Sequence, residues 1–372
     1  MMGSERLGLL TFSFTCNPGS ALQAYALHEA VTKLGGVCEV INYQKLGGGK
    51  QYIGKTVFYP PIKKWRPKTV LIWTARLLAY NIKMPKYIAF QNKYLHFNQR
   101  EPLLLSEMPE TNKKYDTFIV GSDQVWNFWN EKVDYTYFLD FAESGKKKIA
   151  YAASFGQEQV PDIHKEKVTE LLRKFSAISV REYQGQDIVK QLIARDATLV
   201  LDPTLLWDKE KYLPLVKESK RDKYVFLYLR EKDKRLESIA KKIAKEKNLK
   251  IIRVYSYVKY KGKLPYGIQS PEEWLGCMKN AEYIVTNSFH AICFSLIFEK
   301  EFFIANLIGV HALNNSRLTS IVQQFCLEER IVDLQTDVFS IKQIDYRKIR
   351  ELLGKKREES FNYLKGALEQ PI

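Results

Sequence analysis

The sequence predicts an α/β protein of two domains, each built on a parallel sheet with helical connections. Short apolar runs rich in Val, Ile, Leu and Tyr alternate with segments of helical periodicity, the pattern of parallel strands joined by crossover helices. The alternation occurs once before and once after a polar segment at residues 208–222, so we expect two sheets. A length of 372 residues is enough for two ordinary domains.

The first domain, residues 1–207, opens with a strand–helix–strand unit. Residues 7–12 are predicted to form a strand, and residues 37–43 a second one. The helix between them opens at Ser20, and Gln23 three residues later completes the spacing of a capping box. The intervening turn therefore lies at the carboxyl end of a strand. Further strands are predicted at 117–120, 148–153, 177–180 and 198–201, with a helix at 182–194.

Residues 45–112 interrupt this alternation and are predicted to be a basic, helical insertion, with helices near 70–80 and 85–94. The chain has 58 Lys and Arg against 42 Asp and Glu, a net charge of +16, and much of the excess lies between Lys45 and Lys93. Basic residues beside aromatic ones suit a membrane surface with anionic lipids, and a solvated insertion fits equally well. No nucleic-acid-binding signature accompanies the charge, so we expect no nucleic-acid partner.

The second domain is predicted at residues 223–344, after a linker at 208–222. The segment 345–372 is a C-terminal amphipathic helix with no following strand, and it can pack back on the first domain. Strands are predicted at 224–229, 250–255, 283–286 and 302–305, with helices at 235–247, from 271, at 291–298 and at 318–325.

The composition favours a soluble protein of the cytoplasm, either free or peripheral at the inner face of the cell membrane. No run approaches the ~18 apolar residues of a membrane span, and the N-terminus lacks the features of a signal peptide. The five cysteines are an odd number without a Cys-x-x-Cys pair, so we expect reduced thiols. No spacing of histidines or cysteines indicates a metal site, and no cofactor is expected.

Ligands of open α/β sheets bind beyond the carboxyl ends of the strands, and polar clusters follow several predicted strands here. At the first strand–helix turn, Asn17, Gly19 and Ser20 combine a close backbone approach with free N–H groups at a helix start, which favours anions. A capped turn without a ligand explains these residues equally well.

A second cluster follows the strand that ends at residue 120. Ser122, Asp123 and Gln124 are adjacent polar side chains, and Trp126 follows them. Asp123 can orient or deprotonate a sugar hydroxyl, and Trp126 can stack on a sugar face. The alternative is an ordinary Asx-type cap on the next segment.

Three further positions complete the candidate site. Arg181, at a strand end beside Glu182, can bind a carboxylate or phosphate, although such a pair is often structural. His290 stands at the start of a buried helix, where the dipole lowers the pKa of an imidazole and attracts anions. Arg317 can complete an anion site. The neighbours of His290 in the preceding turn are Asn287 and Ser288.

In order along the chain, these segments resemble the polysaccharide pyruvyl transferase family. The resemblance runs from about residue 8 to about residue 330, and each block is weak alone whereas the ordered set is specific. The blocks are residues 17–27 (NPGSALQAYAL), 115–127 (YDTFIVGSDQVWN), 151–156 (YAASFG), 179–182 (SVRE), 201–204 (LDPT), 281–290 (AEYIVTNSFH) and 315–317 (NSR).

The resemblance implies two facing Rossmann-like domains, as in GT-B glycosyltransferases, with the active site between them. It also implies transfer of pyruvate from phosphoenolpyruvate onto two hydroxyls of a sugar or lipid-linked precursor, forming a cyclic ketal. By carry-over, Arg181 and His290 are the main site residues. We expect His290 to supply or relay a proton, Arg181 and Arg317 to hold the donor, and Asp123 to act on the acceptor.

The chain departs from the family at three positions. In the first strand–helix turn, Ser20 follows Gly19 where some members have an acidic residue. Ser288 stands two residues before His290, where members often have Arg. Ala291 follows His290, where members often have Gly. Without that Arg, the identity of the donor substrate is open. The alternative enzyme is a glycosyltransferase of the same fold that uses a nucleotide sugar, and Glu272 or Glu273 is its candidate ribose ligand. A non-catalytic scaffold docked on a membrane is the alternative of another class.

Overall fold

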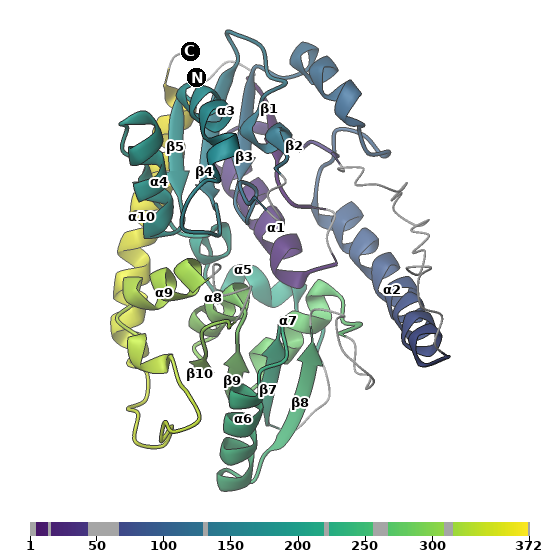
Figure 1. Ribbon diagram of the computed structural model, residues 1–372, viewed down its shortest axis with the longest axis vertical. Coiled ribbons are helices and arrows are strands. Elements are labelled where there is room, and N and C mark those ends of the chain that lie inside the picture. Colours follow the sequence, from purple (N-terminus) through teal and green to yellow (C-terminus); the bar gives the residue numbers. More distant parts are fainter. Residues whose placement is uncertain are drawn as a thin grey trace.

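A computed structural model of the chain describes residues 5–13, 16–43, 67–128, 133–218, 223–255, 267–308 and 315–370. It shows two domains stacked along the long axis, each with one sheet whose strands are all parallel (Figure 1). The predicted fold class, an α/β protein with two facing domains that are each built on a parallel sheet, is confirmed.

The sheet of the first domain has six strands in the order β2-β1-β3-β4-β5-β6. Alternate side chains point to opposite faces, so Leu9 and Ile119 pack with α1 in one apolar cluster while Phe118 and Val120 pack with α3 and α4 in another. The elements are β1 (Arg6–Leu10), α1 (Pro18–Lys33), β2 (Val37–Val40), β3 (Thr117–Gly121), β4 (Lys147–Ala153), α3 (Asp162–Arg173), β5 (Ala177–Val180), α4 (Tyr183–Ile193) and β6 (Thr198–Leu199).

The sheet of the second domain has four strands in the order β10-β9-β7-β8. Its two faces are covered by α6 on one side and by α7 and α8 on the other. The elements are β7 (Tyr224–Leu229), α6 (Lys234–Glu246), β8 (Lys250–Tyr255), α7 (Pro271–Asn280), β9 (Tyr283–Thr286), α8 (Phe289–Ile297), β10 (Glu301–Ile304) and α9 (Asn315–Gln324). Short helical turns are η2 (Tyr135–Phe138), α5 (Lys209–Tyr212), η4 (Leu213–Leu215) and η6 (Glu328–Arg330).

The two domains share one apolar cluster. It runs from α1 through the short helix η3 (Pro203–Leu206) to α7 and α8 of the second domain. Two hydrogen bonds cross near its edge: Tyr183 N donates to Ser320 Oγ at 3.1 Å, and Gln324 Nε2 to the carbonyl of Arg181 at 3.4 Å. These contacts hold the carboxyl edges of the two sheets against each other.

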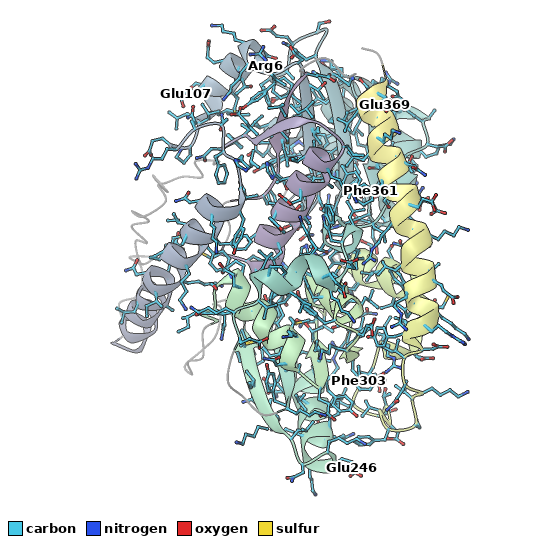
Figure 2. The ribbon with its side chains drawn as sticks, turned by 180° about the vertical axis from the view of Figure 1, so that it is seen from behind. Arg6, Glu107, Glu246, Phe303, Phe361 and Glu369 are labelled. Atoms are coloured by element: carbon cyan, nitrogen blue, oxygen red, sulfur yellow. The ribbon has the colours of Figure 1, made fainter. Side chains whose placement is uncertain are left out.

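The C-terminal helix α10 (Tyr346–Glu369) runs alongside both domains, as Figure 2 shows from behind. Its last turns lie on the first sheet: Lys147 Nζ donates to the carbonyl of Leu368 at 2.8 Å, and Tyr363 OH to that of Ala150 at 3.0 Å. The chain thus returns to the first domain after completing the second, which ties the two together.

The insertion contains α2 (Pro67–Tyr94), a single helix where the sequence predicts two, and the 3-10 helix η1 (Leu105–Lys113). The expected break before Pro85 does not occur. Proline has no backbone N–H to donate, but Tyr87 and Phe90 on the same helix are buried against the core, and this packing stabilises the helix on both sides of Pro85. Residues 44–66, where much of the basic segment falls, lie outside the described residues. Among the described helices, none is both long and apolar enough to cross a bilayer.

Candidate active site

Four charged or titratable side chains from both domains meet where the carboxyl edges of the two sheets face each other. Asp123 follows β3 and Arg181 follows β5, while Asp202 precedes η3. His290 enters from the first turn of α8 in the second domain. All four are buried, so charge interactions among them are little screened by water.

Arg181 is the centre of this cluster. Its Nη1 donates to Asp202 Oδ2 at 2.7 Å, and its Nη2 to Asp123 Oδ1 at 3.5 Å. Its Nε lies 3.6 Å from Glu182 Oε2, and its guanidinium covers the ring of Phe289 at 4.4 Å. Through these contacts the guanidinium fixes the positions of the three carboxylates. The expectation that it binds the donor through a free bidentate face does not fit this geometry.

Asp202 is a member of the site that sequence reasoning missed, although the block that contains it belongs to the family pattern. Its Oδ2 accepts from Arg181 and, at 2.9 Å, from Ser122 Oγ, and it lies 3.7 Å from His290 Nε2. Its Oδ1 accepts from Thr204 N and Oγ1 at 3.0 and 2.7 Å. The carboxylate is therefore held in place to orient an imidazole and to stabilise its protonated form.

The first turns of two helices meet at His290. Gly19, in the first turn of α1, packs so closely on the ring that a Cβ there would stand 2.3 Å from its Nδ1. His290 itself is in the first turn of α8, whose N-cap is Ser288. Asn17 caps α1 and accepts from Gly19 N at 3.0 Å. Two helix N-termini together favour an anion at this point.

The surroundings of His290 favour a neutral imidazole. Burial lowers its pKa below the ordinary value of 6.5, Asp202 and Asp123 oppose the shift, and Arg181 and Arg317 add to it. Its Nε2 has no hydrogen-bond partner among the described residues. This nitrogen lies 3.7 Å from Asp202 Oδ2, so any substrate atom that it binds also meets that carboxylate.

Asp123 adopts a left-handed backbone conformation, with φ of 68°, which is uncommon outside glycine and often marks a functional position. Ser20 Oγ donates to its Oδ2 at 2.5 Å, so Ser20 of α1 positions this carboxylate. Burial opposes ionisation, but His290 in its protonated form, Arg181 and Ser20 outweigh it and lower the pKa of Asp123 below its ordinary value. Asp123 is therefore a weak base, better suited to orienting a hydroxyl than to deprotonating it.

Arg317, in the first turn of α9, is buried beside this cluster, where the sequence predicts an anion-binding residue. Burial lowers the pKa of Arg317 well below its ordinary value, and the positive charges of Arg230 and Arg181 lower it further. Arg230, directly after β7, is a second residue that sequence reasoning missed. Arginines held this close favour an anion that neutralises them.

Asn287 and Ser288 differ in what their side chains do. Asn287 fastens the two strand-end turns of the second domain together, because its Oδ1 accepts from Arg230 N at 2.8 Å and its Nδ2 donates to the carbonyl of Glu231 at 3.1 Å. Those bonds place Arg230. Ser288 is buried at the start of α8, and its side chain makes no capping bond.

The predicted acceptor residues are corrected at two positions. Trp126 is fully buried among Phe138, Phe155 and Phe175, and its Nε1 donates to the carbonyl of Tyr137 at 2.9 Å, so it has no face for a sugar.

Ser122 is also fully buried, and its hydroxyl is used by Asp202. Gln124 is half-buried, with its amide against Gly156, and its role stays a prediction.

The two glutamates considered as ribose ligands lie at the start of α7. Glu273 completes a capping box with Ser270 and forms ion pairs with Lys86 at 2.7 Å and Lys217 at 3.3 Å. A carboxylate so engaged is not set up to bind a ribose. In the described part of the chain, no group of three or more His, Cys, Asp or Glu is placed to hold a metal ion.

The model of the polysaccharide pyruvyl transferase family matches residues 17–306. The chain belongs to this family. It is therefore a transferase of a family that acts on polysaccharides, and its site lies where family blocks from the two domains meet. No curated protein sequence matches the chain.

The solved structures that match the chain are remote in sequence. The UDP-GlcNAc 2-epimerase of Methanocaldococcus jannaschii, in complex with UDP-GlcNAc and UDP, is 11% identical over 94% of this chain and 99% of that one, with a TM-score of 0.43. S. aureus MnaA with UDP is 10% identical over 98% and 97%, with a TM-score of 0.48. The E. coli ADP-heptose heptosyltransferase II is 10% identical over 95% and 99%, with a TM-score of 0.37.

Proposed function

We propose that this pyruvyl transferase family member moves pyruvate from phosphoenolpyruvate onto two hydroxyls of one sugar in a surface polysaccharide or its lipid-linked precursor. The product is a cyclic ketal, and phosphate leaves. The observation that carries the proposal is the combination at His290: an imidazole with an unpartnered nitrogen, two helix N-termini and the arginines Arg181, Arg230 and Arg317. That combination suits a small, multiply charged anion that must receive a proton.

The donor fits the charge of the site. Phosphoenolpyruvate has a carboxylate and a phosphate, and the N-termini of α1 and α8 offer backbone N–H groups to such oxygens. Arg317 and Arg230 supply the positive charge that Ser288 cannot. Arg181 contributes through its field and by ordering Asp123 and Asp202.

The chemistry requires two C–O bonds to form at the central carbon of the donor while two bonds break there, the C–O bond to phosphate and the π bond to the methylene carbon. The methylene carbon gains a proton, each of two sugar hydroxyls bonds to the neighbouring carbon, and the C–O bond to phosphate breaks. The two hydroxyl protons end on the methyl group and on phosphate, so the atoms balance. His290, whose Nε2 lies 3.7 Å from Asp202 Oδ2, relays the proton, a contribution of roughly 10²–10⁴ in rate for general acid–base catalysis. Asp123 orients the attacking hydroxyl.

A lipid-linked acceptor would bring the chain to the inner face of the cell membrane. The excess of Lys and Arg in residues 45–93 supports binding to an anionic membrane surface, and this support comes from charge alone. Co-sedimentation with vesicles that contain anionic lipid, compared with neutral vesicles at matched salt, tests it. Equal partition between the two would contradict it.

A thermal-shift comparison separates the donor candidates. At matched ionic strength, phosphoenolpyruvate should raise the melting temperature and UDP-sugars should not, because Glu273 is already engaged by Ser270 and two lysines. Inorganic sulfate serves as the control for a general anion effect. Stabilisation by a UDP-sugar and none by phosphoenolpyruvate would favour the glycosyltransferase alternative.

A further inference from the structure

A cavity of about 570 Å³ lies at the edge of the first domain, away from the four-residue cluster around His290. It is bounded by the last turns of α2 and by residues 97–102, which run beside the end of β2. Its volume is within the roughly 300–1,000 Å³ of small-molecule sites. The proposed transfer reaction does not use it.

The cavity is on the same sheet edge as the site. Val40 of β2 and Ile119 of β3 both pair with Leu9 of β1, so they stand at the same level of the sheet. Asn42, which lines the cavity, and Asp123 each lie two residues beyond the end of their strands. With neighbouring strands ~4.8 Å apart, the two positions are about 10 Å apart across the sheet, and Asp123 lies two residues further along the strand direction than Asn42.

The lining has the chemistry of a neutral, hydroxyl-rich ligand. Four amide side chains line the cavity, and amides both donate to and accept from hydroxyl groups. The two charged residues, Arg100 and Glu101, are of opposite sign, so the lining has no excess charge that would select an anion. The amides are Asn42, Gln91, Asn92 and Gln99.

Asn42 offers an acceptor that no described residue uses. The residue is 2% exposed, and its Nδ2 donates to the carbonyls of Gln99 and Arg100 at 3.1 and 2.9 Å, which fixes the orientation of the amide. Its Oδ1 has no partner among the described residues. Because this oxygen is buried, a ligand hydroxyl reaches it only when the amide turns toward the cavity, and the bond then relieves the cost of an unpaired acceptor.

A hydrogen bond connects the cavity to the catalytic edge. Gln91, on the cavity wall, donates through Nε2 to the carbonyl of Ser13, in the segment between β1 and α1. The N-terminal turn of α1 carries Gly19 and Ser20 to His290 and Asp123. The wall of the cavity and the reacting groups therefore belong to one connected framework.

We infer that this cavity binds the sugars of the acceptor that lie beyond the reacting one, as a neutral oligosaccharide subsite. The inference rests on the proposed function for the identity of the reacting sugar. One terminal sugar would lie at Asp123 and His290 while its neighbours occupy the cavity, so the chain would select acceptors by length as well as by terminal sugar.

Binding of the full chain to an array of neutral and acidic oligosaccharides, without phosphoenolpyruvate, tests the inference. We expect neutral oligosaccharides to bind. Asn92→Trp should fill the cavity from an exposed position on α2 and raise the Kd about tenfold or more. Lys93→Trp, also exposed on α2 but outside the lining, is the matched control and should leave the Kd within about twofold.

No binding to any neutral oligosaccharide, binding to acidic ones alone, or equal Kd values for Asn92→Trp and Lys93→Trp would overturn the inference. A different result would contradict the proposal that phosphoenolpyruvate is the donor. If phosphoenolpyruvate gives no thermal shift while a neutral oligosaccharide binds and Asn92→Trp weakens it, the donor is wrong and the subsite stands.

Discussion

Gly19 of the first domain lies directly against the imidazole of His290 from the second. A Cβ at Gly19 would stand 2.3 Å from both Cγ and Nδ1 of the ring, closer than any real side chain is found. The contact places the first turns of α1 and α8 together and closes one side of the imidazole. The position of His290 thus depends on a residue that has no side chain.

Gly19→Ala should displace the imidazole without unfolding the protein. Alanine favours helices over glycine by roughly 0.5–1 kcal/mol, so the loss should appear in kcat rather than in expression. A displacement of about 1 Å can cost about 10²-fold in rate. Gly354→Ala in α10 is the control, because its Cβ would meet no atom within 4 Å, and it should keep full activity. Equal activity of the two variants would contradict this role.

Donor binding should be accompanied by proton uptake at His290. Burial lowers the pKa of the imidazole in the free protein, and the negative charges of the donor should raise it again. The Kd for phosphoenolpyruvate should therefore decrease as the pH falls from about 8 to about 6. Titration calorimetry in two buffers of different ionisation enthalpy measures the uptake. His290→Gln should abolish it and, with it, nearly all turnover.

The same lowered pKa has a consequence for stability in the absence of donor. A depressed folded-state pKa contributes stability that is present above the unfolded value of 6.5 and is lost as the pH falls, because only the unfolded chain then takes up the proton. The free energy of unfolding of His290→Gln, from urea melts, should change less than that of wild type between about pH 7 and pH 5. A steeper change in the variant would show that the folded imidazole is charged.

Arg317 should contribute to donor binding at the expense of stability. Replacing a buried cation whose pKa is lowered by burial and by neighbouring arginines with methionine should leave the melting temperature unchanged or higher. The KM for phosphoenolpyruvate should rise at least about tenfold. Arg347→Met, at an exposed arginine in the first turn of α10, is the control. Unchanged KM for Arg317→Met would remove this residue from the donor site.

Trp126 should behave as a core residue. Trp126→Phe deletes part of a fully buried ring and the Nε1 bond to Tyr137, so unfolding should become easier by about 1–3 kcal/mol. The KM for the acceptor should stay the same, because no face of the ring reaches the site. A large rise in acceptor KM at unchanged stability would restore the original expectation of sugar stacking.

The strands and the three main site residues were predictable because their signals are local. An apolar run followed by polar residues marks the carboxyl end of a parallel strand, and this placed Asp123, Arg181 and His290 correctly at facing sheet edges. Their meeting depends on the packing of two domains, which the ordered family blocks implied.

Other features depend on partners far away in the chain. Asp202 before Pro203 has the local pattern of a turn, and its role comes from Arg181 and His290. Arg230 stands in a run of charged residues typical of a solvated turn, until Asn287 fixes its backbone. Trp126 is buried by aromatic rings that the sequence places at residues 138, 155 and 175.

The central claim is tested most directly by the mass of the acceptor. The chain is incubated with phosphoenolpyruvate and a panel of neutral oligosaccharides or lipid-linked sugars, with His290→Gln in parallel. We predict that one acceptor gains the mass of one pyruvate less one water, that phosphate is released in equal amount, and that the variant yields neither. Sugar transfer from a nucleotide sugar, with no pyruvylated product from any acceptor, would contradict the account.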